Sequence, residues 1–320
     1  MRSITLIEAI REAYIEEMKA DDKILMIGQD IQGTSWPNQT GLVQMFGEER
    51  IIDTPISETG MYGAAMGSAM MGYRTIVDFM FSGISYIAAS EILQQTSQYY
   101  FVHGGQVPIP LVITAVAGAG GKLVNEHSQT PHAFFLHHPG IKVAFASTPY
   151  DAKGLMKSAI RDNNPVVLFW HVGLMMDIGP VPEEEYIVPL GVADVKREGS
   201  DVTVVATGLM VKHSLQAAKT LENEISVEVL DLRSYEPLDF DAILHSLEKT
   251  NRMVIVDEDT KRCGFAGELM AQVMEKGFDL LDRPIVRVCN ENAALPGGYL
   301  EKLFIPNPEK IMDAIRKVVS

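Results

Sequence analysis

Short apolar segments alternate with amphipathic segments along most of this 320-residue chain. In the first half, the apolar runs predict strands, and longer stretches with helical spacing lie between them. The predicted strands are 24–27, 51–53, 75–80, 111–116, 142–146 and 166–170, and the main predicted helices are 60–72, 85–101 and 150–162. Apolar strands separated by helices are typical of a parallel sheet that is covered on both faces.

The alternation stops at residues 176–191, MDIGPVPEEEYIVPLG, and then restarts. This stretch holds three prolines and three successive glutamates, which favours an interdomain linker. Beyond it, VTVVAT, SVEVLDL, MVIVDE and PIVRVC predict strands, and helices are predicted near 211–222, 239–249, 265–276 and 308–318. We therefore predict an α/β protein of two domains, each a mostly parallel sheet covered by helices, at residues 1–180 and 188–320 with a linker at 181–187.

The N-terminal segment predicts a surface helix. Thr5 and Glu8 have the spacing of a capping box, and Leu6 and Ile10 begin an apolar stripe that continues through Ala13 and Tyr14. The segment becomes charged where a signal peptide would turn apolar. The most apolar run, PVVLFWHVGLMM, is far shorter than the roughly 20 residues that cross a membrane. We expect a cytoplasmic protein with no membrane partner.

Composition narrows the possible partners. The formal net charge is −15, and no run of Lys or Arg forms the basic face that a nucleic-acid-binding protein needs. The two cysteines, Cys263 and Cys289, match no metal or redox spacing, so we expect free thiols.

One glycine-rich stretch resembles a phosphate loop without matching one. VAGAGGKLV, residues 116–124, follows a predicted strand. A dinucleotide fingerprint that begins at Gly118 needs glycine where Leu123 stands, and a P-loop needs Ser or Thr after Lys122. We expect a flexible glycine loop there. No G-x-S-x-G motif occurs, and no G-D-G motif followed by Asn occurs either.

Four of the eight histidines lie in one short segment, NEHSQTPHAFFLHHPG, residues 125–140. His127, His132, His137 and His138 allow three interpretations: a polar loop with hydrogen-bonding histidines, an acid/base histidine, or a metal site. No helical H-x-x-x-H pair supports the metal site.

Glu58 is the other unusual residue. It stands between a short apolar strand and a helix made of Gly, Ala, Ser and Met. Glutamate is rarely buried without a partner. Either Glu58 caps the helix from the surface, or its carboxylate is held in a pocket for chemistry.

Several long motifs resemble a known family. They are RIIDTPISE (50–58), EHSQ (126–129), HPGIKVA (138–144), TPYDAKGLMKSAIRDNNPVV (148–167) and LRSYEPLD (232–239). They resemble the β subunit of thiamine-diphosphate-dependent 2-oxoacid dehydrogenases, the E1 components of pyruvate, branched-chain and acetoin dehydrogenases. The resemblance covers nearly the whole chain and implies a transketolase-like pyrimidine-binding domain followed by a transketolase C-terminal domain.

The resemblance implies roles for particular residues. Glu58 would hydrogen-bond N1′ of the thiamine aminopyrimidine and so promote loss of the thiazolium C2 proton, while Met80 and Ile84 would line the pyrimidine pocket. His127 would face the reacting substrate, where an imidazole can shuttle protons. Backbone carbonyls would bind a monovalent cation, usually potassium: those of Leu111, Ala159, Ile160, Asp162 and Asn164.

The absent G-D-G…N motif implies a partner. In this family that motif holds Mg²⁺ and the diphosphate and belongs to a separate α subunit. The resemblance therefore implies an α2β2 assembly with thiamine diphosphate at the α/β interfaces. It also implies a lipoyl acyltransferase (E2) as acyl acceptor and a 2-oxoacid or acetoin as substrate.

The sequence departs from the usual family pattern at several positions. Gln29 stands where Glu is usual, Ile84 where an aromatic ring is common, and Ser90-Glu91 where Asp-Gln is common. VDEDTKRCG (256–264) leans toward acetoin-dehydrogenase-like members. Three hypotheses follow: an E1-type β subunit, a transketolase-like enzyme without a lipoyl partner, or a non-catalytic structural subunit.

Overall fold

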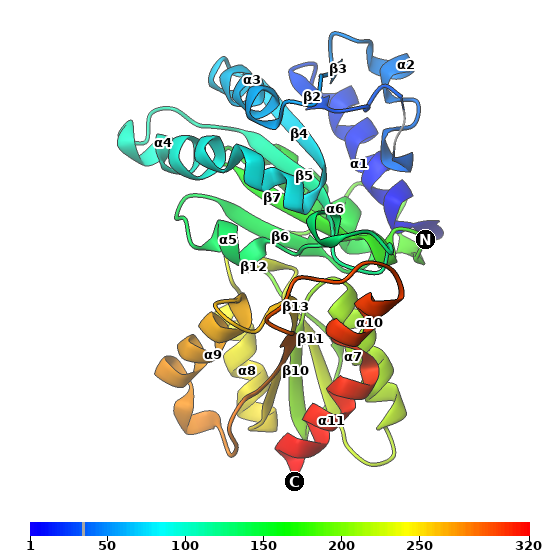
Figure 1. Cartoon of the computed structure of the whole chain (residues 1–320), viewed down its shortest axis with the longest axis vertical. Helices are drawn as coiled ribbons and strands as arrows, with labels where there is room; N and C mark the ends of the chain where they lie inside the picture. Colours follow the sequence, from blue (N-terminus) through cyan, green and yellow to red (C-terminus); the bar gives the residue numbers. More distant parts are fainter. Residues whose placement is uncertain (34–35) are drawn as a thin grey trace.

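The computed structural model describes residues 1–33 and 36–320, and its two α/β halves are stacked end to end (Figure 1). Among the described residues, seven strands form the upper sheet in the order β12-β6-β7-β5-β4-β2-β3. They are β2 (Ile24–Gly28), β3 (Ile51–Asp53), β4 (Arg74–Phe81), β5 (Leu111–Ala117), β6 (Lys142–Ala146), β7 (Val166–His171) and β12 (Ser234–Glu236). All six strands predicted in this half are confirmed, and they run parallel.

Strand β12 comes from the second half of the chain and was not predicted. It pairs antiparallel with β6, with Ser234 opposite Ala144. The upper sheet is therefore completed by a segment from beyond the predicted linker.

The helices of the first half follow the predicted alternation. They are α1 (Leu6–Ala20), α2 (Leu42–Phe46), α3 (Glu58–Met70), α4 (Ser97–Val102), α5 (His132–Leu136) and α6 (Pro149–Arg161). The capping box at α1 is confirmed: Glu8 N–H donates to Thr5 Oγ1 (3.3 Å), and Thr5 N–H donates to Glu8 Oε2 (2.9 Å).

The single helix predicted at 85–101 is wrong. The segment is divided into a 3₁₀ turn η2 (Ser82–Ala88), a π-helical segment η3 (Ser90–Thr96) and α4. Serine side chains donate hydrogen bonds to backbone carbonyls in this segment: Ser85 Oγ donates to Ser82 O, and Ser97 Oγ donates to Leu93 O. Such bonds compete with regular helix geometry, and π segments are frequent at functional sites.

The lower sheet follows the order β14-β13-β10-β11-β9, counted over the residues that the structure describes. Its strands are β9 (Asp194–Arg197), β10 (Val202–Ala206), β11 (Val227–Asp231), β13 (Met253–Thr260) and β14 (Val286–Asn290), and only the pairing of β9 is antiparallel. Helices cover both faces (Figure 1): α7 (Leu209–Thr220) and α11 (Pro308–Val319) on one, α8 (Phe240–Thr250) and α9 (Phe265–Lys276) on the other.

Short helical pieces complete the chain: α10 (Glu301–Phe304), η1 (Pro37–Gln39), η4 (Asn125–His127), η5 (Val172–Leu174), η6 (Phe278–Leu280) and η7 (Gly298–Leu300). The predicted fold class is confirmed.

Part of the stretch read as a linker is a strand. β8 (Ile178–Val181) pairs antiparallel with β1 (Arg2–Thr5). Proline has no backbone N–H to donate, but Pro180 is tolerated because the outer edge of a two-stranded ribbon pairs with no further strand. Residues 182–193 contain no helix or strand.

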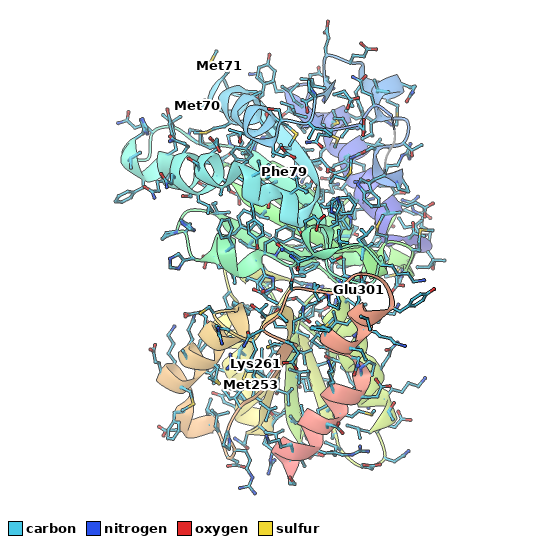
Figure 2. All side chains as sticks on the ribbon, viewed as in Figure 1. Met70, Met71, Phe79, Met253, Lys261 and Glu301 are labelled. Atoms are coloured by element: carbon cyan, nitrogen blue, oxygen red, sulfur yellow. The ribbon has the colours of Figure 1, made fainter. Side chains whose placement is uncertain are left out.

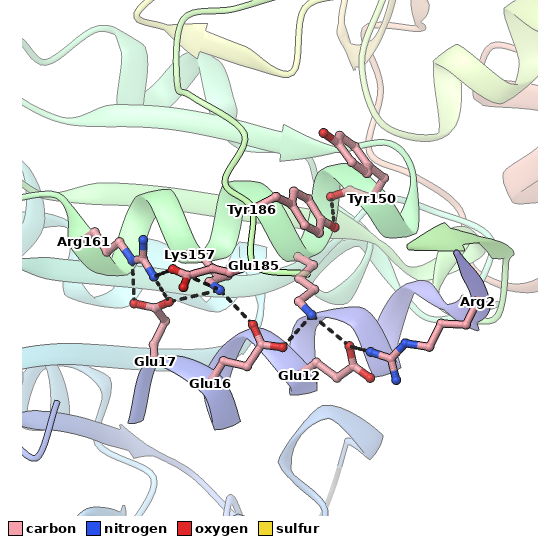
Figure 3. A network of polar contacts seen from close by, with 10 residues as sticks. Arg2, Glu12, Glu16, Glu17, Tyr150, Lys157, Arg161, Glu185 and Tyr186 are labelled. Atoms are coloured by element: carbon pink, nitrogen blue, oxygen red, sulfur yellow. Dashed lines mark hydrogen bonds and ion pairs between the residues drawn. The ribbon is translucent and has the colours of Figure 1, made fainter. Parts of the chain in front are cut away.

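An ion network joins α1 to α6 (Figure 3). Lys153 and Lys157 have fully or almost fully buried side chains, and both reach Glu16, at 2.6 and 2.8 Å. Arg161 forms a two-bond pair with Glu17 and also contacts Glu185, which follows β8. A buried ammonium group is tolerated only with such partners, so these acids fix the packing of α6 on α1.

Other sequence expectations concern the thiols and membranes. Neither Cys263 nor Cys289 is in a disulfide within the described residues. Of the helices in residues 1–33 and 36–320, none is both long and apolar enough to span a bilayer.

Candidate cofactor and active site

Glu58 is the first residue of α3, directly after the loop that leaves β3. A carboxylate is favoured at this end of a helix by the helix dipole. The residue is only 8% exposed, and no hydrogen bond or ion pair of its carboxylate is found among the described residues. It makes no capping bond, and neither does the N-cap residue Ser57. The residue is buried as a whole, but its carboxylate oxygens are not among the fully enclosed unpartnered atoms, so the unpaired acceptor can still be reached by a ligand and does not cap the helix.

Met80 lies at the carboxyl end of β4 in a left-handed conformation, with φ of +65°. This conformation is uncommon for a residue other than glycine. Asp78, 2% exposed, stabilises it, because Met80 N–H donates to Asp78 Oδ1 (2.7 Å) while Gln39 Nε2 donates to Asp78 Oδ2 (3.0 Å). Burial raises the pKa of Asp78 to about 6, although these bonds oppose the shift.

Ile84 and His127 lie on the elements that follow. Ile84 belongs to η2 and packs against the apolar core of the upper sheet. His127 ends η4, and its ring meets the Phe81 ring edge-on with centroids 4.4 Å apart. The Trp36 ring also packs edge-on against Phe81, with ring centroids 5.5 Å apart. The Phe81 ring thus limits where the His127 imidazole can lie, and Trp36 in turn supports Phe81.

The turn η2 brings these parts together. Thr59 Oγ1, beside Glu58, donates to Ile87 O at the end of η2 (3.3 Å). At the start of η2, Ser82 Oγ donates to Gln129 O (2.6 Å). Gly83 lies so close to the loop that an added Cβ would stand 2.3 Å from Glu126 O. These contacts make η2 the link between the start of α3, which carries Glu58, and the loop that carries His127, with Met80 and Ile84 on the chain on either side of Ser82.

The histidines of the 125–140 segment do not converge on a metal. His132 is buried, with Nε2 3.1 Å from Asp257 Oδ1. Burial alone would lower the pKa of His132, but the Asp257 carboxylate outweighs it and raises the pKa. His138 Nδ1 lies 3.3 Å from Phe134 O. Over the described residues, no group of three or more His, Cys, Asp or Glu could hold a metal ion.

The carbonyls predicted to bind potassium lie around the end of α6. Arg74 donates to two of them, Ile160 O (3.2 Å) and Asp162 O (2.8 Å). A carbonyl oxygen has two lone pairs, so each can still ligate a cation. Carbonyl oxygens are of the type that a hard monovalent cation binds, but the Arg74 guanidinium already bonds two of the five, and its charge opposes a second cation there.

The residues also fit half of a thiamine cofactor. An unpaired carboxylate can accept a hydrogen bond from a protonated ring nitrogen, and Met80 and Ile84 are apolar side chains on β4 and η2. Among the described residues, no group of three or more His, Cys, Asp or Glu could hold the Mg²⁺ that accompanies the diphosphate. What the geometry offers is an incomplete site.

Acidic residues of the lower half contact the loop that carries His127, and sequence reasoning did not single them out. Glu258 on β13 and Glu301 on α10 both accept hydrogen bonds from the glycine loop after β5. Asp78 was missed as well. The available signal was an acid inside an otherwise apolar strand, in TIVDFMF and MVIVDE.

Fold and site define a two-domain protein of the transketolase type. Residues 2–176 match the pyrimidine-binding domain of transketolase, and residues 191–311 match the transketolase C-terminal domain. A solved split-gene transketolase, an inactive β4 tetramer, superposes with a TM-score of 0.81 at 23% identity, over 99% of this chain and 98% of that one. A transketolase from Pichia stipitis gives a TM-score of 0.70 at 18% identity, over all of this chain and 46% of the other. These two likenesses establish the fold alone.

Relatives at higher identity define the family. The β subunit of the acetoin:2,6-dichlorophenolindophenol oxidoreductase of Bacillus subtilis is 42% identical, over 97% of this chain and 96% of that protein. The β subunit of the pyruvate dehydrogenase E1 component of the same organism is 38% identical, over 100% and 99%. Its 2-oxoisovalerate dehydrogenase β subunit is 39% identical, over 99% of both chains. The chain belongs to this family of 2-oxoacid dehydrogenase E1 β subunits, as the sequence motifs predicted.

Proposed function

We propose that this chain is the β subunit of a thiamine-diphosphate-dependent E1 enzyme. The enzyme decarboxylates a 2-oxoacid, or cleaves acetoin, and transfers the acyl group to lipoamide. The observation that carries the proposal is Glu58, a buried carboxylate without a partner among the described residues, at the position of the family motif. Family membership supports the reaction class.

In this proposal the chain binds the pyrimidine half of the cofactor. Glu58 holds a proton between its carboxylate and N1′ of the aminopyrimidine, and Met80 and Ile84 exclude water around the ring. When bound, thiamine diphosphate would supply an acidic carbon, C2 of its thiazolium ring, which becomes a nucleophile for the substrate carbonyl after it loses its proton. Because Glu58 is buried as a whole, a bound ring would exclude the remaining water and strengthen the hydrogen bond between them.

His127 is proposed to act on the reacting substrate. Its side chain is about one third exposed (34%), so it can meet a small molecule, and Phe81 limits its rotation. A positioned imidazole can give or take a proton and typically contributes ~10²–10⁴ in rate.

We propose an α subunit as the partner that completes the site in an α2β2 assembly. That subunit holds Mg²⁺ and the diphosphate. Large apolar side chains are left uncovered at both ends of α3: Ile56, 81% exposed, precedes Glu58, and Met71, 80% exposed, lies at the opposite, outer end of the helix (Figure 2). Exposed apolar surface of this kind marks protein interfaces. A lipoyl acyltransferase (E2) is the proposed acyl acceptor, and the cytoplasm remains the predicted location.

Potassium at the carbonyls of Leu111, Ala159, Ile160, Asp162 and Asn164 is also a proposal. A ligand that binds only the folded chain stabilises it by about 2.7 kcal/mol at 100-fold excess over its Kd. Replacing choline chloride with KCl at constant ionic strength should therefore raise Tm. An unchanged Tm would contradict the potassium site.

The alternatives have weaker support. A transketolase-like activity without a lipoyl partner is less well supported, because the transketolases described above are only 18–23% identical whereas the E1 β subunits are 38–42% identical. A purely structural subunit is disfavoured because Glu58 and His127 are both present.

The test is an assay of the α/β pair. Pyruvate, branched-chain 2-oxoacids and acetoin are offered separately, with a lipoyl domain as acceptor, and acyl-lipoamide is measured. We expect acyl transfer from at least one of these substrates. Turnover of sugar phosphates with no acyl-lipoamide from any 2-oxoacid or acetoin would contradict the proposal.

A further inference from the structure

The glycine loop after β5 presents backbone N–H groups to carboxylates of the lower half. Gly118 and Gly120 have φ of +86° and +113°, and a Cβ on Gly118 would stand 1.9 Å from His171 Nε2. Successive amides in such turns form a concavity that binds anions. The loop lacks the fingerprints of phosphate-binding loops, and in this structure the anions are side chains of the chain itself.

Two carboxylates occupy the loop. Ala119 N–H donates to Glu258 Oε1 (2.8 Å), and the N–H groups of Gly120 and Lys122 both donate to Glu301 Oε2 (2.9 and 3.2 Å). Glu301 is 3% exposed and lies between the two halves of the molecule (Figure 2). Its Oε1 has no partner among the described residues, so the buried charge depends on the two loop amides. Hydrogen bonds to an ionised acceptor are about twice as strong as neutral ones.

The segment that carries Glu301 also holds the far end of the loop. Leu295 N–H donates to Asn125 Oδ1 (3.0 Å), and the Lys122 ammonium lies 4.8 Å from the centre of the Tyr299 ring. Asn125 begins η4, which ends at His127. The segment 295–301 therefore contacts the loop on both sides of Leu123. The contact at Asn125 is two residues before His127.

We propose that Glu301 is a positioning residue for His127. Its carboxylate fixes the backbone of Gly120 and Lys122, and this sets the place of η4 and of the His127 ring against Phe81. Glu301 reaches the loop backbone and not the imidazole, so its effect is indirect. The lower half of the chain thereby takes part in the chemistry of the upper half. The proposal rests on the proposed role of His127.

The first test measures the loop directly by amide hydrogen exchange in the full chain. Glu301→Gln keeps the shape of the side chain and removes its charge, and Glu301→Asp keeps the charge on a shorter arm. Glu291→Gln is the matched control, because Glu291 is exposed in the same part of the chain. We expect exchange at Gly120 and Lys122 to be roughly tenfold faster in Glu301→Gln, intermediate in Glu301→Asp and unchanged in the control. Equal exchange in Glu301→Gln and the control would overturn the proposal.

The second test measures coupling in the assembled α/β enzyme. A displaced catalytic group can cost about 10²-fold in rate, so Glu301→Gln should lower kcat by roughly 10- to 100-fold with little change in KM. In a His127→Ala background the same substitution should cause no further loss, because residues that act as a unit are not additive. Losses that multiply would show that Glu301 acts on general stability, and this would overturn the proposal. Full activity of His127→Ala would refute the role of His127, and the exchange comparison would still decide whether Glu301 holds the loop.

Discussion

Asp78 shows how one buried carboxylate can shape the candidate site without touching it. It lies inside β4, accepts the N–H of Met80 and so stabilises the left-handed backbone conformation of Met80, a residue of the pyrimidine pocket proposed above. Its raised pKa, about 6, records the cost of keeping this charge away from water.

The raised pKa of Asp78 predicts a pH dependence of stability. The folded chain binds a proton at Asp78 more readily than the unfolded chain does. The contribution of this proton to the free energy of unfolding is therefore fully present below about pH 4. It is lost as pH rises through about 6, by about 3 kcal/mol. Urea unfolding of the wild type and Asp78→Asn, repeated from pH 4 to pH 7, should show the difference in unfolding free energy changing across this range. Parallel curves would contradict the assignment, and exposed Asp22→Asn serves as the control.

Residue roles could be predicted where a motif names them. Glu58 and His127 stand in long motifs, so the sequence indicated both. Glu258 and Glu301 gave no such signal, because their partners are backbone amides of a loop more than a hundred residues away. Only the fold brings such pairs together.

Strands were predicted most closely. Those of the two sheet centres are continuous apolar runs, and the structure places β3 and β6 at the predicted residues. The missed strands β1, β8, β9 and β12 are short, and each pairs antiparallel with a segment far away in sequence. The 85–101 helix was wrong because its apolar spacing does not reveal that serines bond the local backbone.

The contact between α1 and α6 predicts a second stability effect. Burial opposes ionisation of Glu16, but Lys153 and Lys157 outweigh it and lower its pKa. The stabilisation is therefore present above about pH 4.5 and is lost as pH falls further. Glu16→Gln should cost about 2 kcal/mol at pH 7, less than a fully buried pair because Glu16 is partly exposed. Urea unfolding measures this loss, and a cost equal to that of Asp22→Asn would contradict it.

At the scale of the whole molecule, the proposal gives this chain half of a cofactor site. We predict that the isolated chain does not bind thiamine diphosphate tightly, because the described residues hold no metal cluster and the sequence lacks the G-D-G…N motif. Calorimetry with Mg²⁺ should show binding only when the α subunit is present. Micromolar, Mg²⁺-dependent binding to the isolated chain would refute this prediction.

The domain boundaries remain a prediction. The two matched regions, residues 2–176 and 191–311, lie on either side of the proposed linker at 181–187. Strand β12 and the contacts of Glu258 and Glu301 cross this division, so the two halves depend on each other.

The most direct test of the central claim is hydrogen–deuterium exchange at thiamine C2 in the assembled α/β complex, followed by NMR. Glu58→Gln keeps the shape of the side chain and removes the proton that would couple to N1′, with exposed Glu48→Gln as the matched control. We predict that exchange slows by ~10²–10⁴, about 3–5 kcal/mol of barrier, only in Glu58→Gln. Wild-type exchange in Glu58→Gln at full cofactor occupancy would contradict the assignment of Glu58.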